Sequence, residues 1–373
     1  MKDKFYIIIF ISLLIFIVYI LFPNISFASY RFTNFKAYPP IHVFKTLLPY
    51  PQGLSPKKVK EIYNLPQTGG HGTIAIIGAY DATSIEADLN IFSKAFNLPA
   101  CTTKNGCFEK HIMGSGTKSN LGWALEISLD VEWAHAIAPK TKILLIEAKT
   151  PSGANLLKAI DYAASRKDVV AISMSWGGPE FTDETSLDSH FKSISKASFF
   201  ASSGDNGTGA SWPASSPNVI SVGGTTINLK NDSSFISETA WSGSGGGVSA
   251  YESEPDYQKS LNIPKANGMR AIPDISYGAD PKTGFSVYKT TPHSNGWYVV
   301  GGTSAGAPQW AAIQSLGLSA TLPNLYKDKI SSKSNLYFRD IKSGSNGDCQ
   351  YYCDARARYD YVTGLGSPLT DSF

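Results

Sequence analysis

The segment Gly302-Thr303-Ser304-Ala305, with Pro308 shortly after it, places a serine at the expected start of a helix. A hydroxyl at a helix N-terminus has free backbone N–H groups and a favourable dipole beside it, which suits a nucleophile for acyl transfer. Ser and Thr are also common helix N-caps, so the segment alone permits a purely structural role. The other polar motifs of the chain must decide between the two.

A Glu and an Asp one helical turn apart are the second candidate group. Glu126 and Asp130 lie at i and i+4 in a helix expected from Leu121 to Ala138, which Pro139 ends. This spacing puts both carboxylates on one helix face, among apolar neighbours. Burial of two like charges would make the pair share a proton. A solvated pair on an exposed face is the alternative, and the apolar neighbours disfavour it.

The third candidate is Asp205, in the Gly-rich segment 203–207 that follows an apolar run. Only a protonated carboxylic acid can donate a hydrogen bond to a developing oxyanion. This role would require acidic conditions or a raised pKa for Asp205. An Asp between glycines is otherwise an ordinary turn residue.

Together these motifs resemble those of the subtilisin-like fold, which is shared by subtilisins and by sedolisins, the serine-carboxyl peptidases. A subtilisin requires an Asp, a His and a Ser in that order along the chain. His71 is the candidate His, but only Asp3 precedes it, and we interpret His71 as a turn residue. The carboxylate pair and Asp205 instead match the sedolisin pattern, so the chain is identified as a member of the sedolisin family.

This resemblance implies a secreted, acid-acting serine-carboxyl endopeptidase. Ser304 would attack the peptide carbonyl, Glu126 would take and return the proton, and Asp130 would orient Glu126. Asp205 and a backbone N–H would stabilise the oxyanion. A tripeptidyl-peptidase of the same family is the alternative enzyme. A non-catalytic exported binding protein is the alternative from another class, which the presence of all four residues disfavours.

Two further segments resemble the walls of the family's substrate groove. Ser173–Gly178 is expected at the carboxyl end of a strand, where an extended peptide can pair with exposed backbone. Gly245–Ser249 would form the other wall. The expected partners are therefore peptide or protein substrates.

The C-terminal part resembles the calcium-binding stretch of sedolisins. By position, Asp340 and Asp360 would bind one Ca²⁺ through their side chains, and Ile341 through its carbonyl. Arg356 and Arg358 stand where the family has two Gly carbonyl ligands. The resemblance implies one calcium ion, and the positively charged side chains of Arg356 and Arg358 would lie close to it.

The elements that must position these residues alternate between strands and helices. Short apolar runs fit buried parallel strands, and Ser152 is a candidate N-cap for a helix with an apolar face at Leu156, Leu157 and Ile160. We expect an α/β fold with a mostly parallel sheet and helices on both faces. The expected strands are Thr73–Ala79, Lys142–Ala148, Val169–Ser175 and Ser198–Ser203.

The four cysteines form two close pairs, Cys101 with Cys107 and Cys349 with Cys353. In an exported protein these pairs indicate two small-loop disulfides. A zinc site is the alternative, but neither pair has CxxC spacing and no HExxH motif occurs.

The N-terminal residues indicate export. Residues 1–28 combine two lysines, a long apolar run and a small-residue site ending at Ala28, which is typical of a cleaved signal peptide. An uncleaved membrane anchor is the alternative. We interpret residues 29–50 as an arm lying on the domain, and 51–373 as a sedolisin-type domain without a long prodomain.

The charge of the chain limits its partners. The net charge is only +3, which does not favour nucleic-acid binding. We also expect a monomer that acts on peptides, with membrane contact only if the N-terminal segment stays attached.

Overall fold

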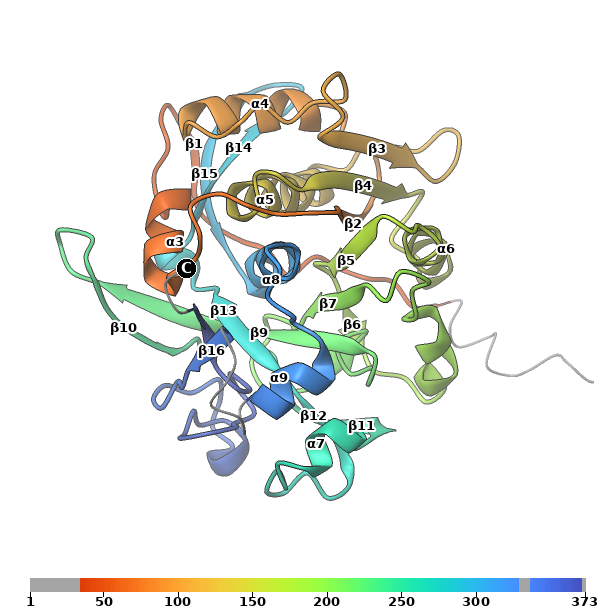
Figure 1. Ribbon diagram of the computed structural model, residues 1–373, viewed down its shortest axis with the longest axis vertical. Coiled ribbons are helices and arrows are strands. Elements are labelled where there is room, and N and C mark those ends of the chain that lie inside the picture. Colours follow the sequence, from red (N-terminus) through yellow and green to blue (C-terminus); the bar gives the residue numbers. More distant parts are fainter. Residues whose placement is uncertain (1–33, 329–335, 371–373) are drawn as a thin grey trace, which may run out of the picture.

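All four predicted strands lie in one eight-stranded sheet at the centre of the computed structural model (Figure 1), which describes residues 34–328 and 336–370. Strands β2 (Thr73–Ala79) and β4 (Lys142–Ala148) have the predicted bounds. Strands β5 (Val169–Met174) and β7 (Ser198–Ser202) each end one residue earlier than predicted. The predicted signal peptide, residues 1–28, lies outside the described residues.

The sheet is parallel except at one edge, as predicted. Its order is β10-β9-β7-β5-β2-β4-β3, and only β10 pairs in the antiparallel direction. β4 and β5 lie on either side of β2. In open parallel sheets, ligand sites lie outside the carboxyl ends of the strands, so a site is expected at that end of this sheet. The other members are β3 (Phe108–Ile112), β9 (Val219–Leu229), β10 (Phe235–Ala240) and β13 (Ile275–Gly278), which pairs with β9.

Helices cover both faces of the sheet (Figure 1), because successive residues of its buried strands point to opposite sides. In β2, Ile74 and Ile76 join one apolar cluster with residues of α5 (Leu121–Ile137) and α8 (Gly306–Ser315). Ala75 and Ile77 join a second cluster with α6 (Gly153–Ala164). The predicted fold class is therefore confirmed.

Two local expectations need correction. Ser152 occupies the N-cap position of α6, but its hydroxyl makes no capping bond and instead accepts a hydrogen bond from Thr150 Oγ1 at 3.2 Å. The described part of the predicted arm, residues 34–50, includes a strand that the sequence did not predict, because β1 (His42–Leu48) pairs antiparallel with β15 (Asn295–Gly301).

The remaining elements surround this core. The small sheets are β1-β15-β14 (Phe285–Thr290), β11 (Gly247–Ser253) with β12 (Met269–Ile272), β16 (Leu336–Arg339) with β17 (Ser367–Thr370), and β6 (Gly178–Pro179) with β8 (Ser211–Trp212). The other helices are α3 (Pro56–Tyr63), α4 (Ile85–Ala95), α7 (Asp256–Lys259) and α9 (Leu322–Asp328). Short 3₁₀ turns are η1 (Glu184–His190), η2 (Pro281–Thr283), η3 (Thr303–Ala305) and η4 (Gln350–Tyr352).

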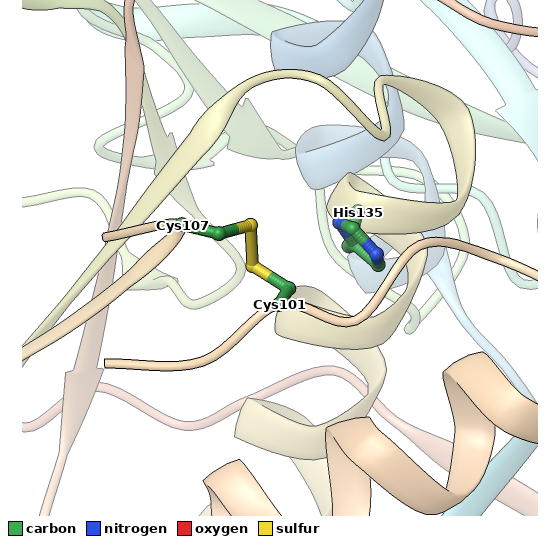
Figure 2. A group of neighbouring side chains, drawn as sticks. All are labelled: Cys101, Cys107 and His135. Carbon is green, nitrogen blue, oxygen red and sulfur yellow. A yellow bond between two sulfur atoms is a disulfide. The ribbon is translucent and has the colours of Figure 1, made fainter. Parts of the chain in front are cut away.

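Both predicted disulfides are formed, Cys101–Cys107 and Cys349–Cys353. Figure 2 shows His135 beside the first disulfide, where its Nε2 lies 2.8 Å from the carbonyl oxygen of Pro99. The two sulfurs are bonded to each other and cannot act as thiolate ligands. This group is therefore not a metal site.

Within residues 34–328 and 336–370, no helix has the length and apolar content needed to cross a bilayer.

Candidate active site

The two carboxylates predicted to share a helix face are both buried in α5. Glu126 and Asp130 are each 1% exposed. Asp130 Oδ1 accepts a hydrogen bond of 2.6 Å from the hydroxyl of Ser175. Among the described residues, neither carboxylate oxygen of Glu126 has a hydrogen-bond partner. Glu126 is therefore the member of the pair whose oxygens remain available for a reaction.

Ser304 lies in η3, immediately before α8, as predicted for a serine at a helix entry. The residue is fully buried, and its Oγ has no hydrogen-bond partner in the described part of the chain. Its backbone carbonyl accepts a bond of 3.2 Å from the Ser175 hydroxyl. Ser175, directly after β5, thus connects the Asp130 carboxylate to the Ser304 backbone.

Burial dominates the electrostatics of this pair. It raises the pKa of Glu126 well above its usual value, and the nearby charge of Asp130 raises it further. A hydrogen bond from the Ser304 hydroxyl would stabilise the charged carboxylate and so lowers the pKa of Glu126. Burial also raises the pKa of Asp130, against the hydrogen bond from Ser175. Burial therefore favours the protonated form of both carboxyl groups.

Asp205 follows β7 and reaches the same centre through Thr303. Its Oδ1 accepts hydrogen bonds from the Thr303 backbone N–H at 2.8 Å and from Thr303 Oγ1 at 2.7 Å. The side chain is 5% exposed. Burial raises the pKa of Asp205, against the influence of His42. Because Thr303 precedes Ser304, this carboxyl is held one residue away from the candidate nucleophile.

His42 is a site residue that sequence reasoning missed. Its Nε2 lies 3.1 Å from Asp205 Oδ2, and this hydrogen bond raises the pKa of His42. His42 begins β1, far from Asp205 in the sequence, so no local spacing links the two. His71, by contrast, is exposed before β2. Its position agrees with the prediction that it is a turn residue.

A cavity of about 490 Å³ lies beside these residues. Both predicted groove segments contribute to its lining, through Gly177 and Gly178 on one side and Gly245 on the other. Asp205, Pro40 and His42 line it as well. The fold therefore brings Asp205 and both predicted groove segments to one cavity.

Four of the five residues predicted for calcium form two contacting pairs, Arg358 with Asp340 and Arg356 with Asp360. The backbone N–H of Arg358 donates to Asp340 Oδ1 at 3.0 Å, and that of Arg356 donates to Asp360 Oδ2 at 3.1 Å. Burial raises the pKa of Asp360 to about 6. Among the described residues, no hydrogen bond uses the carbonyl oxygens of Ile341, Arg356 or Arg358. Both carboxylates also accept hydrogen bonds from the surrounding loop, Asp340 from the N–H of Arg358 and Asp360 from Val362, Thr363 and Arg356.

A family model described as the subtilase family matches residues 110–333, which is more than half of the chain. The chain belongs to the subtilase family. The matched subtilase region contains all four candidate catalytic residues, Glu126, Asp130, Asp205 and Ser304.

Individual relatives point to one branch of the subtilases. The chain is 28% identical to sedolisin from Pseudomonas sp. (strain 101), over 85% of this chain and 60% of that protein. It is 30% identical to kumamolisin from Bacillus sp. (strain MN-32), over 86% of this chain and 62% of that protein. The chain thus spans about 60% of the length of these relatives.

A solved structure of Pseudomonas sedolisin, described as a serine-carboxyl proteinase, superposes with a TM-score of 0.71 at 27% identity. The match covers 87% of this chain and 96% of that chain. These similarities support the sedolisin family that the sequence motifs indicate, and its members are serine-type peptidases.

We expect Ser175→Ala to move the acid limb of the pH–activity profile to higher pH. In the unaltered subtilase, the hydrogen bond from Ser175 lowers the pKa of Asp130. Without this bond the pKa of Asp130 rises, and the carboxylate pair takes up protons at higher pH. The measurement is kcat for peptide cleavage across a pH series. Ser173→Ala is the matched control, since Ser173 is equally buried but its hydroxyl has no partner in the described residues. An unshifted limb for Ser175→Ala would contradict a positioning role for Ser175.

Proposed function

We propose that this chain is a serine-carboxyl endopeptidase that hydrolyses peptide bonds under acidic conditions. The observation that carries the proposal is a buried Glu126–Asp130 pair beside a buried serine hydroxyl with no other partner. A nucleophile and a base within reach of each other, with the base oriented by a third group, is the general arrangement for acyl transfer.

The reaction assigns one role to each group. Ser304 Oγ attacks the peptide carbonyl while Glu126 accepts its proton, and Glu126 then protonates the leaving amine. Asp130 orients Glu126 and is itself held by Ser175 at 2.6 Å. Asp205, protonated, donates a hydrogen bond to the tetrahedral oxyanion together with a backbone N–H. Water then hydrolyses the acyl-enzyme, with Glu126 acting as base again.

The endopeptidase mode is favoured over a tripeptidyl-peptidase by the length of the groove. A tripeptidyl-peptidase must close its groove after three residues on the amino-terminal side of the cleaved bond. Here residues 35–38 pair with the backbone of Pro151, Gly153 and Gly177, so the backbone that can pair with an extended chain covers more than three residues. A groove of this length accepts the interior of a polypeptide chain.

We expect Ser304→Ala, Glu126→Ala and Asp205→Ala each to abolish most peptide hydrolysis while the chain stays folded. Each removes a different part of one acyl-transfer site, and loss of an oxyanion donor alone costs roughly 10²–10³ in kcat. The measurements are product masses from a peptide substrate and a circular dichroism spectrum of each variant.

The control for this series is His71→Ala, which should cleave peptides almost normally because His71 is exposed outside the site. A serine-reactive phosphonate should label Ser304 in the unaltered chain. An unlabelled, inactive but folded protein would favour the non-catalytic binding protein. Near-normal turnover by any of the three site variants would remove that residue from the mechanism.

We expect activity to peak at roughly pH 3 to 5. Glu126 can accept the proton of Ser304 only when the Glu126–Asp130 pair does not already carry two protons, so activity falls as the pH is lowered. Asp205 donates a hydrogen bond only while it is protonated. Burial raises the pKa of Asp205, so the protonated form persists to higher pH than for an ordinary Asp. Activity falls on the basic side once that proton is lost. The measurement is kcat over a pH series, and a neutral or alkaline peak would contradict this choice of base and donor.

We also propose that one Ca²⁺ binds near the C-terminus through the side chains of Asp340 and Asp360. The carbonyl oxygens of Ile341, Arg356 and Arg358 would complete the site. All five groups are oxygen donors of the kind that calcium prefers. The ion would hold the C-terminal loop to the domain, and the two arginine side chains would weaken its binding.

Calcium chelation should lower the melting temperature, and added calcium should restore it, since an ion bound only by the folded state stabilises that state. The measurement is thermal unfolding followed by circular dichroism, with metal analysis of the purified protein. Asp340→Asn should abolish the response. If the purified protein holds no calcium and the chelator changes nothing, the backbone N–H bonds from Arg356 and Arg358 hold the loop instead.

We further propose that residues 1–28 direct export and are then removed, leaving an arm and a single peptidase domain from residue 51 onward. Two disulfides among the described residues support an oxidising destination outside the cytosol. N-terminal sequencing of the protein recovered from the growth medium tests the cleavage after Ala28. Retention in the membrane fraction would favour an uncleaved anchor.

A further inference from the structure

The side chains of Cys101, Cys107 and His135 meet beside the C-terminal end of α5 (Figure 2). The two sulfurs and a ring nitrogen of His135 all lie within 4.8 Å of one another. Within residues 34–328 and 336–370, no other three His, Cys, Asp or Glu side chains bring their ligand atoms this close together. Two cysteine sulfurs and an imidazole are ligands that zinc and similar cations prefer.

His135 has a ring nitrogen that the fold does not use. The side chain is fully buried, and its Nε2 lies 2.8 Å from the carbonyl oxygen of Pro99. A carbonyl oxygen only accepts hydrogen bonds, so Nε2 carries a proton. Nδ1 has no hydrogen-bond partner among the described residues, and a second proton there would be a buried charge without an acceptor. The imidazole is therefore neutral, with its lone pair on Nδ1.

This arrangement is the one that metal-binding histidines adopt. Such a histidine donates its other ring N–H to a carbonyl or carboxylate, which fixes the tautomer and the orientation of the ring. The Pro99 carbonyl is that acceptor for His135. The ring is thus already held with Nδ1 ready to bind a cation.

The loop between the two cysteines is closed by hydrogen bonds as well as by the disulfide. The side-chain oxygen of Asn105 accepts from the N–H of Thr102 at 3.0 Å and from that of Cys107 at 3.1 Å. The amide nitrogen of Asn105 donates to the carbonyl of Ala100 at 2.8 Å. These bonds do not involve the sulfurs, so the two cysteines stay close together when the disulfide is reduced.

Reduction converts this group into a set of three ligands. A dithiol supplies two electrons and two protons to the sulfurs, and itself becomes a disulfide. A divalent cation then displaces both thiol protons to solvent, because it binds the thiolates. Two thiolates, a neutral imidazole and a divalent cation carry no net charge together, which suits a buried position. Tetrahedral zinc holds such atoms roughly 3.5 to 3.8 Å apart, so the sulfurs need only separate once their bond is broken.

We propose that the reduced chain binds one thiophilic divalent cation, such as Zn²⁺, through Sγ of Cys101, Sγ of Cys107 and Nδ1 of His135. Water takes the fourth position, on the side of Cys107, which is only partly buried. In the oxidised chain the two sulfurs are bonded to each other and no ion binds. The disulfide closes only its own loop, whereas the ion also connects this loop to α5, the helix that carries the carboxylate pair.

The test uses the full chain carrying Cys349→Ser and Cys353→Ser, so that the other cysteine pair cannot bind metal. Co²⁺ is the probe, because cobalt–thiolate bonds give a charge-transfer band and tetrahedral cobalt gives intense visible bands. After reduction with a phosphine, the chain should take up Co²⁺ with both features, and Zn²⁺ should displace it. The oxidised chain should show neither feature. A reduced chain without the thiolate band would overturn the inference.

The variant His135→Gln tests the third ligand. Glutamine keeps a donor for the Pro99 carbonyl but has no nitrogen at the place of Nδ1. It should weaken Zn²⁺ binding by roughly 100-fold, since even groups outside the ligand shell contribute 10- to 100-fold. His111→Gln is the matched control, because His111 lies in β3 outside the cluster, and it should leave the affinity unchanged. Equal affinities for the two variants would contradict the site.

A thermal measurement decides the matter if the buried His135→Gln change prevents folding. Zn²⁺ should raise the melting temperature of the reduced chain and not of the oxidised chain, since only the reduced chain offers the site. Cys107→Ser, at the partly buried position, should remove this response. A reduced chain that does not respond, or an equal rise in both forms, would overturn the inference. These readouts involve no peptide cleavage, so they stand or fall separately from the proposed function.

Discussion

The burial of two carboxylates one turn apart on α5 is the constraint on which the site depends. From Leu125 to Ile137 the whole helix is buried, between the sheet and other elements, so water cannot solvate Glu126 or Asp130. A buried charge must be neutralised or hydrogen-bonded. The available means are a shared proton, the Ser175 hydroxyl and the nearby Ser304 hydroxyl. The loops after β5 and β15 are held where they supply these groups.

Local patterns were sufficient to predict much of this arrangement. Each central strand is a short, mostly apolar run, because parallel strands covered on both faces need no polar side. The bounds of β2 and β4 are therefore readable from the sequence. The Glu126–Asp130 pair is also a local signal, since i and i+4 share a face on any helix.

Contacts between residues far apart in the chain could not be predicted from local sequence patterns. Ser175 and His42 meet their partners only after folding, and nothing in their neighbouring residues indicates Asp130 or Asp205. Strand β1 is exposed along most of its length. Its pairing with β15 satisfies the backbone without burying one face, so its sequence lacks the alternation by which a strand is normally predicted. The pairing of residues 35–38 was hidden for the same reason.

The covalent link between the arm and the domain changes how strongly its contacts must bind. A segment tethered close to the backbone that it pairs with is present there at an effective concentration in the millimolar range, whatever the concentration of the protein. Contacts too weak to hold a free peptide can therefore keep the segment paired. Dilution does not detach such a segment, whereas one cut in the chain after residue 38 would turn the paired residues 35–38 into part of a dissociable peptide.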